Sequence, residues 1–114
     1  MEKVKMFGCK GVQGPYPAIT HYPMANRDGG WTQFEIICST TEKGGVGDWH
    51  KHAEEHMQMV LEGSLKINFR NGQSFDLGPE EAILIRPGEE HEVVNTHDGQ
   101  TKYFVVYAPP RPAK

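Results

Sequence analysis

Residues in the second half of the chain alternate between apolar and polar with a period of two. Residues 64–70 (SLKINFR) and 73–78 (QSFDLG) both follow this pattern, which is typical of β-strands with one buried face. Asn71 and Gly72 lie between the two segments, and an Asn-Gly pair between alternating residues is a strong signal for a β-hairpin. The pattern therefore predicts a strand, a tight turn and a second strand.

Other short apolar segments lie on both sides of this hairpin and are bounded by turn-forming residues. Pro87-Gly88 and the loop-forming residues 96–100 separate the later segments from one another. Strands are expected at residues 31–39, 82–85, 91–95 and 103–107. Several short strands at this spacing predict an all-β sandwich or barrel.

Alternation within two of these strands assigns candidate core residues. Phe34, Ile36 and Cys38 share one face of the first strand, and Tyr103, Val105 and Tyr107 share one face of the last. Core packing is the simplest role for both sets. A buried tyrosine hydroxyl needs a hydrogen-bond partner, so Tyr103 and Tyr107 are also candidate contacts for a ligand in a cavity.

Two segments do not show a clear strand pattern. Residues 8–30 are dense in glycine and proline, which favours an irregular arm that wraps a neighbour or covers the mouth of a barrel. Residues 48–62 (DWHKHAEEHMQMVLE) are rich in good helix formers, begin at a possible N-cap aspartate and are followed by Gly63. Intrinsic propensity is only a weak guide. Helix and strand both remain open here on local pattern alone, and the choice determines where the histidines point.

The composition indicates one ordinary globular domain. The chain has 114 residues, of which 37% are hydrophobic and 24% charged. No apolar run approaches the ~20 residues of a membrane span, and the N-terminal residues lack the apolar core of a secretory signal, so a cytoplasmic protein is expected. A formal charge of −3 argues against a nucleic-acid partner. Cys9 and Cys38 form no CxxC pair and are expected to be free thiols.

Four of the six histidines lie in two short parts of the sequence. His50, His52 and His56 are close together, and His91 follows the Pro87-Gly88 turn. On a strand, His50 and His52 point to the same face, so both imidazoles would converge on one ion inside a barrel, with His56 and His91 completing the shell. Imidazole suits zinc, copper, iron and nickel, and three or four such ligands would leave at least one coordination position open for water or substrate.

A helix would give a different metal site. His52 and His56 would then be four residues apart on one helical face, as in the HExxH motif of zinc hydrolases. Ala53 follows His52 directly, however, whereas the hydrolase motif has its general-base glutamate at that position. The hydrolase interpretation is therefore disfavoured.

The histidine-containing segments resemble the two conserved motifs of the cupin superfamily. Residues 44–63 are similar to the first motif, G(x)5HxH(x)3–4E(x)6G, and residues 80–95 are similar to the second, G(x)5PxG(x)2H(x)3N. The matching residues are Gly44, His50, His52 and Gly63 in the first motif, and Gly88, His91 and Asn95 in the second. His56 stands where the family usually has a glutamate ligand, Glu80 where the second motif has its first glycine, and Arg86 where it has proline.

This resemblance implies a fold and a site. The fold would be a double-stranded β-helix, or jelly roll, with the barrel over residues 31–110, an arm and first strand or strands over 1–30, and a tail over 111–114. His50, His52, His56 and His91 would bind one divalent transition metal ion (iron, manganese, nickel or zinc). Gln58 would share the inward phase of His56 and is a further candidate cavity contact. Met57, Met59 and Leu61 would have the opposite phase, facing either the second sheet or a partner subunit; cupins often form homodimers.

Several functions remain open at this point. The first is a metal-dependent enzyme on a small organic substrate, with oxygen-dependent oxidation slightly favoured over lyase or isomerase chemistry because of the histidine-rich shell. The second is a binding or sensing module that uses the same cavity without turnover. The third is a purely structural metal barrel. A fold alone does not select among them.

Overall fold

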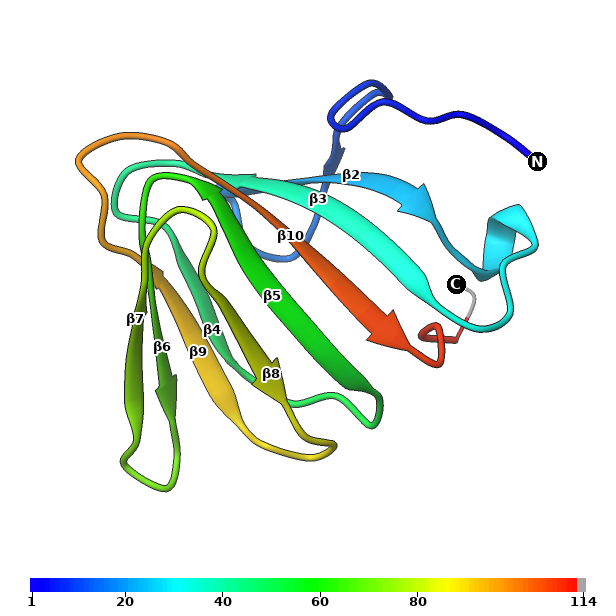
Figure 1. Cartoon of the computed structure of the whole chain (residues 1–114). Helices are drawn as coiled ribbons and strands as arrows, with labels where there is room; N and C mark the ends of the chain where they lie inside the picture. Colours follow the sequence, from blue (N-terminus) through cyan, green and yellow to red (C-terminus); the bar gives the residue numbers. More distant parts are fainter. Residues whose placement is uncertain (113–114) are drawn as a thin grey trace.

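Two antiparallel β-sheets form the fold of residues 1–112, the part of the chain that the computed structural model describes (Figure 1). The larger sheet has the strand order β1-β2-β3-β10-β5-β8, and the smaller has the order β4-β9-β6-β7. A single 3-10 turn, η1, spans Arg27–Gly29 among the described residues. The strands are β1 Val12–Gln13, β2 Ile19–Ala25, β3 Glu35–Thr41, β4 Val46–His50, β5 Glu55–Glu62, β6 Leu65–Phe69, β7 Ser74–Leu77, β8 Ala82–Ile85, β9 His91–Asn95 and β10 Thr101–Ala108.

The hydrophobic core lies between the two sheets. Val60 from the larger sheet and Leu65 and Ile67 from the smaller are fully buried, and the rest of the core alternates with more exposed residues along each strand. Two antiparallel sheets packed in this way form the jelly roll that the sequence predicts, so the predicted fold class is confirmed. Within residues 1–112 no helix is long and apolar enough to cross a membrane.

The hairpin predicted at Asn71-Gly72 joins β6 to β7. The amide of Gly72 donates to the carbonyl of Phe69, and the amide of Phe69 donates to the carbonyl of Gln73. Gly72 has φ +93°, so the loop is a tight turn followed by a left-handed glycine. The left-handed backbone favours glycine there, because glycine has no Cβ.

Residues 48–62 form strands rather than a helix. β4 ends at His50, the chain crosses between the sheets, and β5 begins at Glu55. β5 lies between β10 and β8 in the larger sheet, where it pairs with β10 along its length and with β8 over residues 56–59. Tertiary pairing therefore overrides the local helix propensity of this segment.

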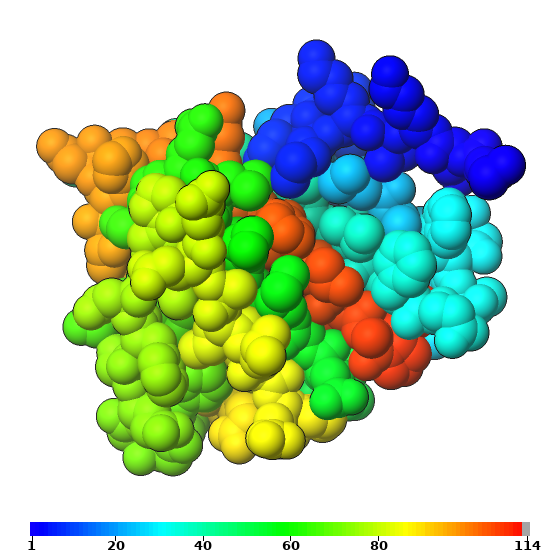
Figure 2. All heavy atoms as spheres, in the orientation of Figure 1, coloured from blue at the N-terminus to red at the C-terminus, as the bar shows by residue number. Residues whose placement is uncertain are grey.

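The N-terminal segment contributes more regular structure than its glycine and proline content predicts. β2 pairs with β3 over most of its length despite containing Pro23, and residues before it lie over the outer side of β2 and β3 (Figure 2). Phe7, for example, packs edge-on against Tyr22 with ring centroids 5.2 Å apart. The segment is thus an arm that leads into an integral strand.

The predicted inward face of the strand at 31–39 is wrong. Glu35, Ile37 and Ser39 are buried and face the core, whereas Phe34 and Ile36 lie on the other face and are only half-buried. Cys38 is on the outer face too, but it is fully buried, with its thiol against Met24 of β2 and beside the backbone of Phe7 in the N-terminal arm. Its burial comes from a segment that local alternation does not reveal.

Asn95 connects the end of β9 to three other parts of the chain. Its side chain is only 6% exposed. The Nδ2 group lies within 2.8–3.1 Å of the carbonyl oxygens of Thr41, Glu42 and Gly99, and Oδ1 accepts hydrogen bonds from the His97 amide and the Thr101 hydroxyl. Asn95 is the last residue of β9, so it stabilises the loops at that end of the barrel, whereas His91 begins the same strand at the other end.

Replacing Asn95 with alanine is expected to destabilise the fold by about 3 kcal/mol, because a buried polar group that loses its partner costs about 1–3 kcal/mol and several partners are lost here. Urea unfolding measures the change. Asn71→Ala is the control, since Asn71 is exposed and its side chain hydrogen-bonds, among residues 1–112, to Gln73 alone; it should cost less than about 1 kcal/mol. Equal losses in the two variants would contradict the role assigned to Asn95.

Candidate metal centre

The pairing of β4 with β9 brings the first two histidines of the site together. His50, the last residue of β4, is the direct cross-strand partner of His91, the first residue of β9. Their ring centroids lie 4.4 Å apart. Both side chains therefore come from the smaller sheet, one from each of two adjacent strands.

The next two histidines lie on the connection to the larger sheet and on the strand that follows it. His52 follows the end of β4, and its backbone carbonyl accepts a hydrogen bond of 2.8 Å from the amide of Gly88. His56 is on β5, and its ring centroid is 5.1 Å from that of His52 and 5.2 Å from that of His91. The crossing thus gathers imidazoles from both sheets at one end of the barrel.

Ring nitrogens of three of these residues converge. One nitrogen each from His50, His52 and His91 lies within 4.8 Å of the other two, a separation suitable for three ligands of one ion. His56 is outside this tightest group, although its ring packs against two members of it. Its Nδ1 is buried and makes no well-aligned hydrogen bond among the described residues, but the Glu54 backbone carbonyl is close enough to raise the pKa of the ring.

Backbone hydrogen bonds orient two of the rings. Nδ1 of His50 is hydrogen-bonded to the carbonyl oxygen of Asp48, and Nδ1 of His91 to that of Glu89 at 2.8 Å. A carbonyl oxygen can only accept, so each Nδ1 carries the proton and donates it. The lone pair of each Nε2 is thereby left for a metal, which is the usual second-shell arrangement of a histidine ligand.

Burial keeps the imidazoles neutral. Desolvation, followed by the neighbouring histidines, lowers the pKa of His52 to about 3. Burial, then His91, lowers the pKa of His56 to about 4, and burial also lowers the pKa of His91. Neutral imidazole is the metal-binding form, so the electrostatics fit a metal site. The cluster contains no carboxylate ligand.

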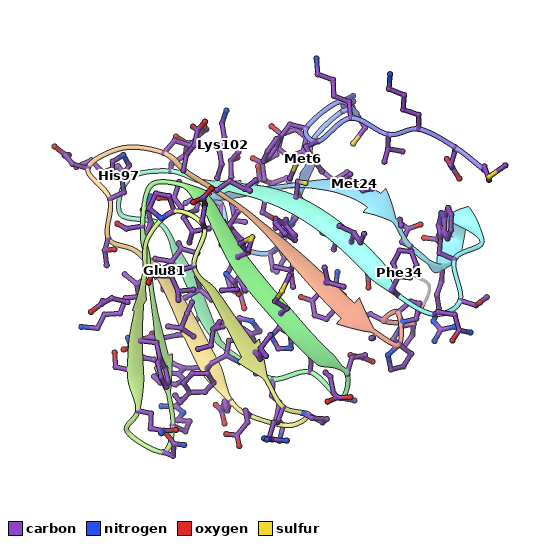
Figure 3. All side chains as sticks on the ribbon, in the orientation of Figure 1. Met6, Met24, Phe34, Glu81, His97 and Lys102 are labelled. Atoms are coloured by element: carbon purple, nitrogen blue, oxygen red, sulfur yellow. The ribbon has the colours of Figure 1, made fainter. Side chains whose placement is uncertain are left out.

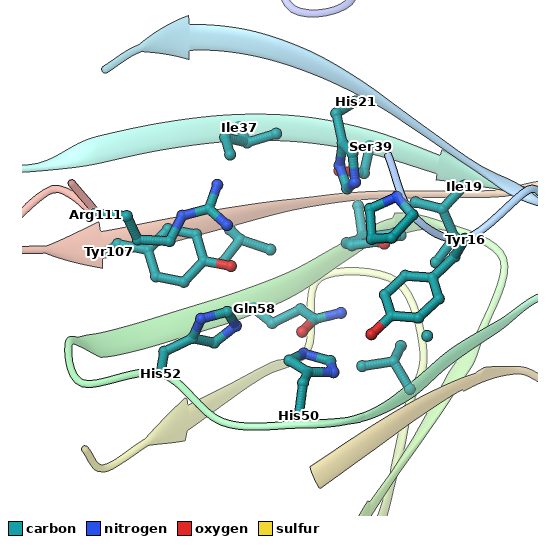
Figure 4. Close-up of a pocket in the computed structure, with 15 residues that line it drawn as sticks. Tyr16, Ile19, His21, Ile37, Ser39, His50, His52, Gln58, Tyr107 and Arg111 are labelled. Atoms are coloured by element: carbon teal, nitrogen blue, oxygen red, sulfur yellow. The ribbon is translucent and has the colours of Figure 1, made fainter. Parts of the chain in front are cut away.

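A cavity of about 210 Å³ adjoins the histidines. Its wall includes His50, His52, Gln58, Tyr103 and Tyr107 (Figure 4). An engineered cavity of about 150 Å³ holds benzene, so this one accommodates a single substituted ring. Gln58 is only 3% exposed, and its Nε2 has no hydrogen-bond partner among residues 1–112.

Several cavity residues lie outside the sequence-based site. Tyr16 and His21 come from the segment predicted as an arm, and the Tyr16 hydroxyl donates to the carbonyl of Asp48 at 3.3 Å. Arg111, in the predicted tail, forms a two-pronged ion pair with buried Glu35, with bonds of 3.1 and 3.0 Å. Its guanidinium also stacks on the Tyr107 ring at 4.3 Å. The rest of the predicted tail, residues 113–114, is outside the described residues.

Backbone conformation explains the glycine positions of the motifs. Gly44, Gly63 and Gly88 all have left-handed φ values, of +75°, +94° and +78°. Glu80, which replaces the first glycine of the second motif, has φ +67°, a conformation that glycine adopts more easily. The turn has therefore kept its shape although its residue type differs.

Comparison with known proteins gives the class of the protein. Residues 39–107 match the Cupin domain family, and the chain therefore belongs to this family. No curated protein sequence matches.

Solved structures with the same fold include three with informative descriptions. The polyketide cyclase RemF from Streptomyces resistomycificus has 29% sequence identity and a TM-score of 0.84, over 99% of this chain and 82% of that one. KdgF from Halomonas sp. has 19% identity and a TM-score of 0.79, over 92% of both chains. A cupin-superfamily sugar phosphate isomerase from Silicibacter pomeroyi has 19% identity and a TM-score of 0.75, over 94% of this chain and 75% of that one. The last two similarities show the fold alone.

The stability of the metal-free protein is expected to decrease as the pH falls below about 6.5. An unfolded histidine takes up a proton near pH 6.5, whereas folded His52 and His56 resist protonation until about pH 3 and 4. Above pH 6.5 both states are neutral and stability is complete. Between pH 6.5 and 4 the unfolded chain binds more protons and is favoured. Urea unfolding at pH 7 and pH 5 measures the difference.

His52→Gln should make the unfolding free energy depend less on pH, because it removes one imidazole whose pKa is lowered in the folded state. His97→Gln is the matched control: His97 is exposed on the loop between β9 and β10 (Figure 3) and should leave the dependence unchanged. A wild-type unfolding free energy that is the same at pH 7 and pH 5 would show that the cluster is not desolvated.

Proposed function

We propose that this cupin is a metal-dependent enzyme that acts on a small organic substrate within the barrel. His50, His52, His56 and His91 would hold one divalent transition metal ion. The observation that carries the proposal is the convergence of ring nitrogens from His50, His52 and His91 within 4.8 Å. The His56 ring packs against those of His52 and His91, and the nearby Glu54 backbone carbonyl raises its pKa, the same two-residue relation that His50 has with Asp48 and His91 with Glu89; this supports His56 as a fourth ligand.

The reaction class we favour is activation of a carbonyl group. A divalent ion held only by neutral imidazoles keeps its full charge and, when bound, polarises a carbonyl oxygen as a Lewis acid. RemF, whose similarity covers 99% of this chain and 82% of RemF, is described as a polyketide cyclase, and polyketides are carbonyl-rich. That similarity supports non-oxidative carbonyl chemistry over the oxygen-dependent oxidation that the histidine content favours.

Residues of the cavity wall would position the substrate. Burial raises the pKa of Tyr107 to about 12, so its hydroxyl remains a proton donor at neutral pH and can hydrogen-bond to a substrate oxygen. Arg111 stacks on the same ring while paired with Glu35, which holds the ring in place. Gln58 offers an unused N–H donor. Each group acts by binding and orientation, with a fixed dipole directed at the substrate.

Removal of a ligand should abolish metal binding without unfolding the protein. We expect about one equivalent of a transition metal in protein purified without added metals, measured by plasma mass spectrometry. His91→Gln should lower the metal content at least tenfold, because the three-nitrogen group loses a member. His97→Gln, outside the site, should retain the wild-type content. Circular dichroism checks that both variants fold.

Incubating the metal-loaded protein with 1,3-diketones and catechols distinguishes the candidate functions. Carbonyl activation predicts a new product by mass spectrometry, no oxygen uptake, and at least a hundredfold loss of rate in His91→Gln. Oxygen uptake together with bound iron would instead support an oxygenase. Binding without product from any compound would support the non-catalytic module, and unfolding of His50→Gln on loss of metal would support a structural ion.

We also propose that the small-molecule enzyme is a homodimer. Met57, Leu84 and Val106 line a groove on the outer face of the larger sheet, and Leu84 is 78% exposed. Covering this apolar surface with a second copy would remove it from water. Sedimentation velocity at micromolar concentration should give twice the chain mass, and Leu84→Lys should give the monomer. A wild-type monomer would contradict the proposal.

A further inference from the structure

The far end of the cavity carries a second polar group that does not involve the four histidines. His21 on β2, Ser39 on β3 and Tyr103 on β10 lie side by side across the larger sheet, since Ser39 is the register partner of both others. Nδ1 of His21 is 2.9 Å from the Ser39 hydroxyl, and Ser39 is also hydrogen-bonded to the Tyr103 side chain. All three line the cavity.

This group is separated from the histidine end by an apolar stretch. Tyr103 and Tyr107 face the same side of β10 and are four residues apart, which is about 13 Å along a strand. Between these two tyrosines, Val105 pairs with Ile37 on β3 and with Gln58 on β5. All three residues line the cavity, and Gln58 is the polar one. In Figure 4, His21 and Ser39 lie on one side of the cavity, His52 and Tyr107 on the other, and Gln58 lies between.

The polar members of this wall are almost completely removed from water. Ser39 is 1% exposed, Gln58 3% and Tyr103 5%. Nε2 of Gln58 has no acceptor among the described residues, and a buried donor left unpaired costs about 1–3 kcal/mol. Burial raises the pKa of Tyr103, so its hydroxyl is protonated and, like that of Ser39, can reorient to donate or accept. An oxygen-bearing ligand in the cavity would satisfy these groups.

We propose that Ser39, Tyr103 and Gln58 form a recognition subsite that selects a ring-sized substrate with a hydroxyl group distal to its carbonyl. The metal end would take the carbonyl oxygen, Ile37 and Val105 would contact the apolar ring, and the Ser39–Tyr103 pair would bind the hydroxyl, with His21 positioning Ser39. Gln58 would donate to an oxygen between the two ends. The carbonyl assignment rests on the proposed function, whereas the hydroxyl subsite stands on its own residues.

Two probes that differ by one hydroxyl test this subsite: acetophenone and 4-hydroxyacetophenone. Titration calorimetry with the zinc-loaded protein is expected to show at least tenfold tighter binding of the hydroxylated probe, since tenfold corresponds to about 1.4 kcal/mol. Ser39→Ala and Tyr103→Phe should each reduce this ratio to less than threefold.

Tyr22→Phe is the matched control, because Tyr22 lies on the outer face of β2 against Phe7 and its substitution should preserve the ratio. Equal affinity of the wild type for the two probes, no binding of either, or an unchanged ratio in both variants would overturn the subsite. The wild-type comparison needs no substitution, so a variant that fails to fold does not weaken the test.

Repeating the titrations after removal of metal separates the subsite from the proposed function. Loss of zinc should weaken both probes to the same extent and leave their ratio unchanged. If zinc has no effect on either affinity, the carbonyl assignment fails while the hydroxyl subsite stands. If the two probes bind with equal affinity but zinc strengthens the binding of both, the subsite fails and the proposed function stands.

Discussion

The candidate site depends on one pairing, that of β4 with β9, which sets His50 directly opposite His91. His52 lies on the connection from the smaller sheet to the larger one, and His56 lies on β5 in the larger sheet. The amide of Gly88 ties this crossing to the turn before β9 through the carbonyl of His52. A one-residue slip of β9 would turn His91 to the opposite face. The convergence of the imidazoles therefore depends on the register of β4 with β9.

Local pattern predicted the parts of the fold whose burial is set by strand alternation. The hairpin at Asn71-Gly72 and the strands at 82–85 and 91–95 depend on neighbouring residues alone, and the structure has them at those positions. The chemistry-bearing histidines were identifiable because they fall in spaced motifs. Segment 48–62 was ambiguous, since only pairing with β10 and β8 makes β5 a strand.

Residues that act through distant contacts could not be predicted in this way. His21 lies among turn-forming residues, and nothing local shows that β2 pairs with β3 and delivers it to the cavity wall. Arg111 follows the last strand, and its partner Glu35 is far away in the sequence. Glu35 itself interrupts an apolar segment, and the ion pair with Arg111 offsets the free-energy cost of burying its charge.

In the proposed site, neutral imidazoles are the only protein ligands of one ion inside the barrel. X-ray absorption spectroscopy of the zinc-reconstituted protein measures this ligand set. We expect a first shell of nitrogen and oxygen near 2.0–2.1 Å, with the multiple scattering of at least three imidazoles and a loss of one imidazole in His52→Gln. A shell containing sulfur at about 2.3 Å, or an imidazole contribution unchanged in His52→Gln, would contradict it.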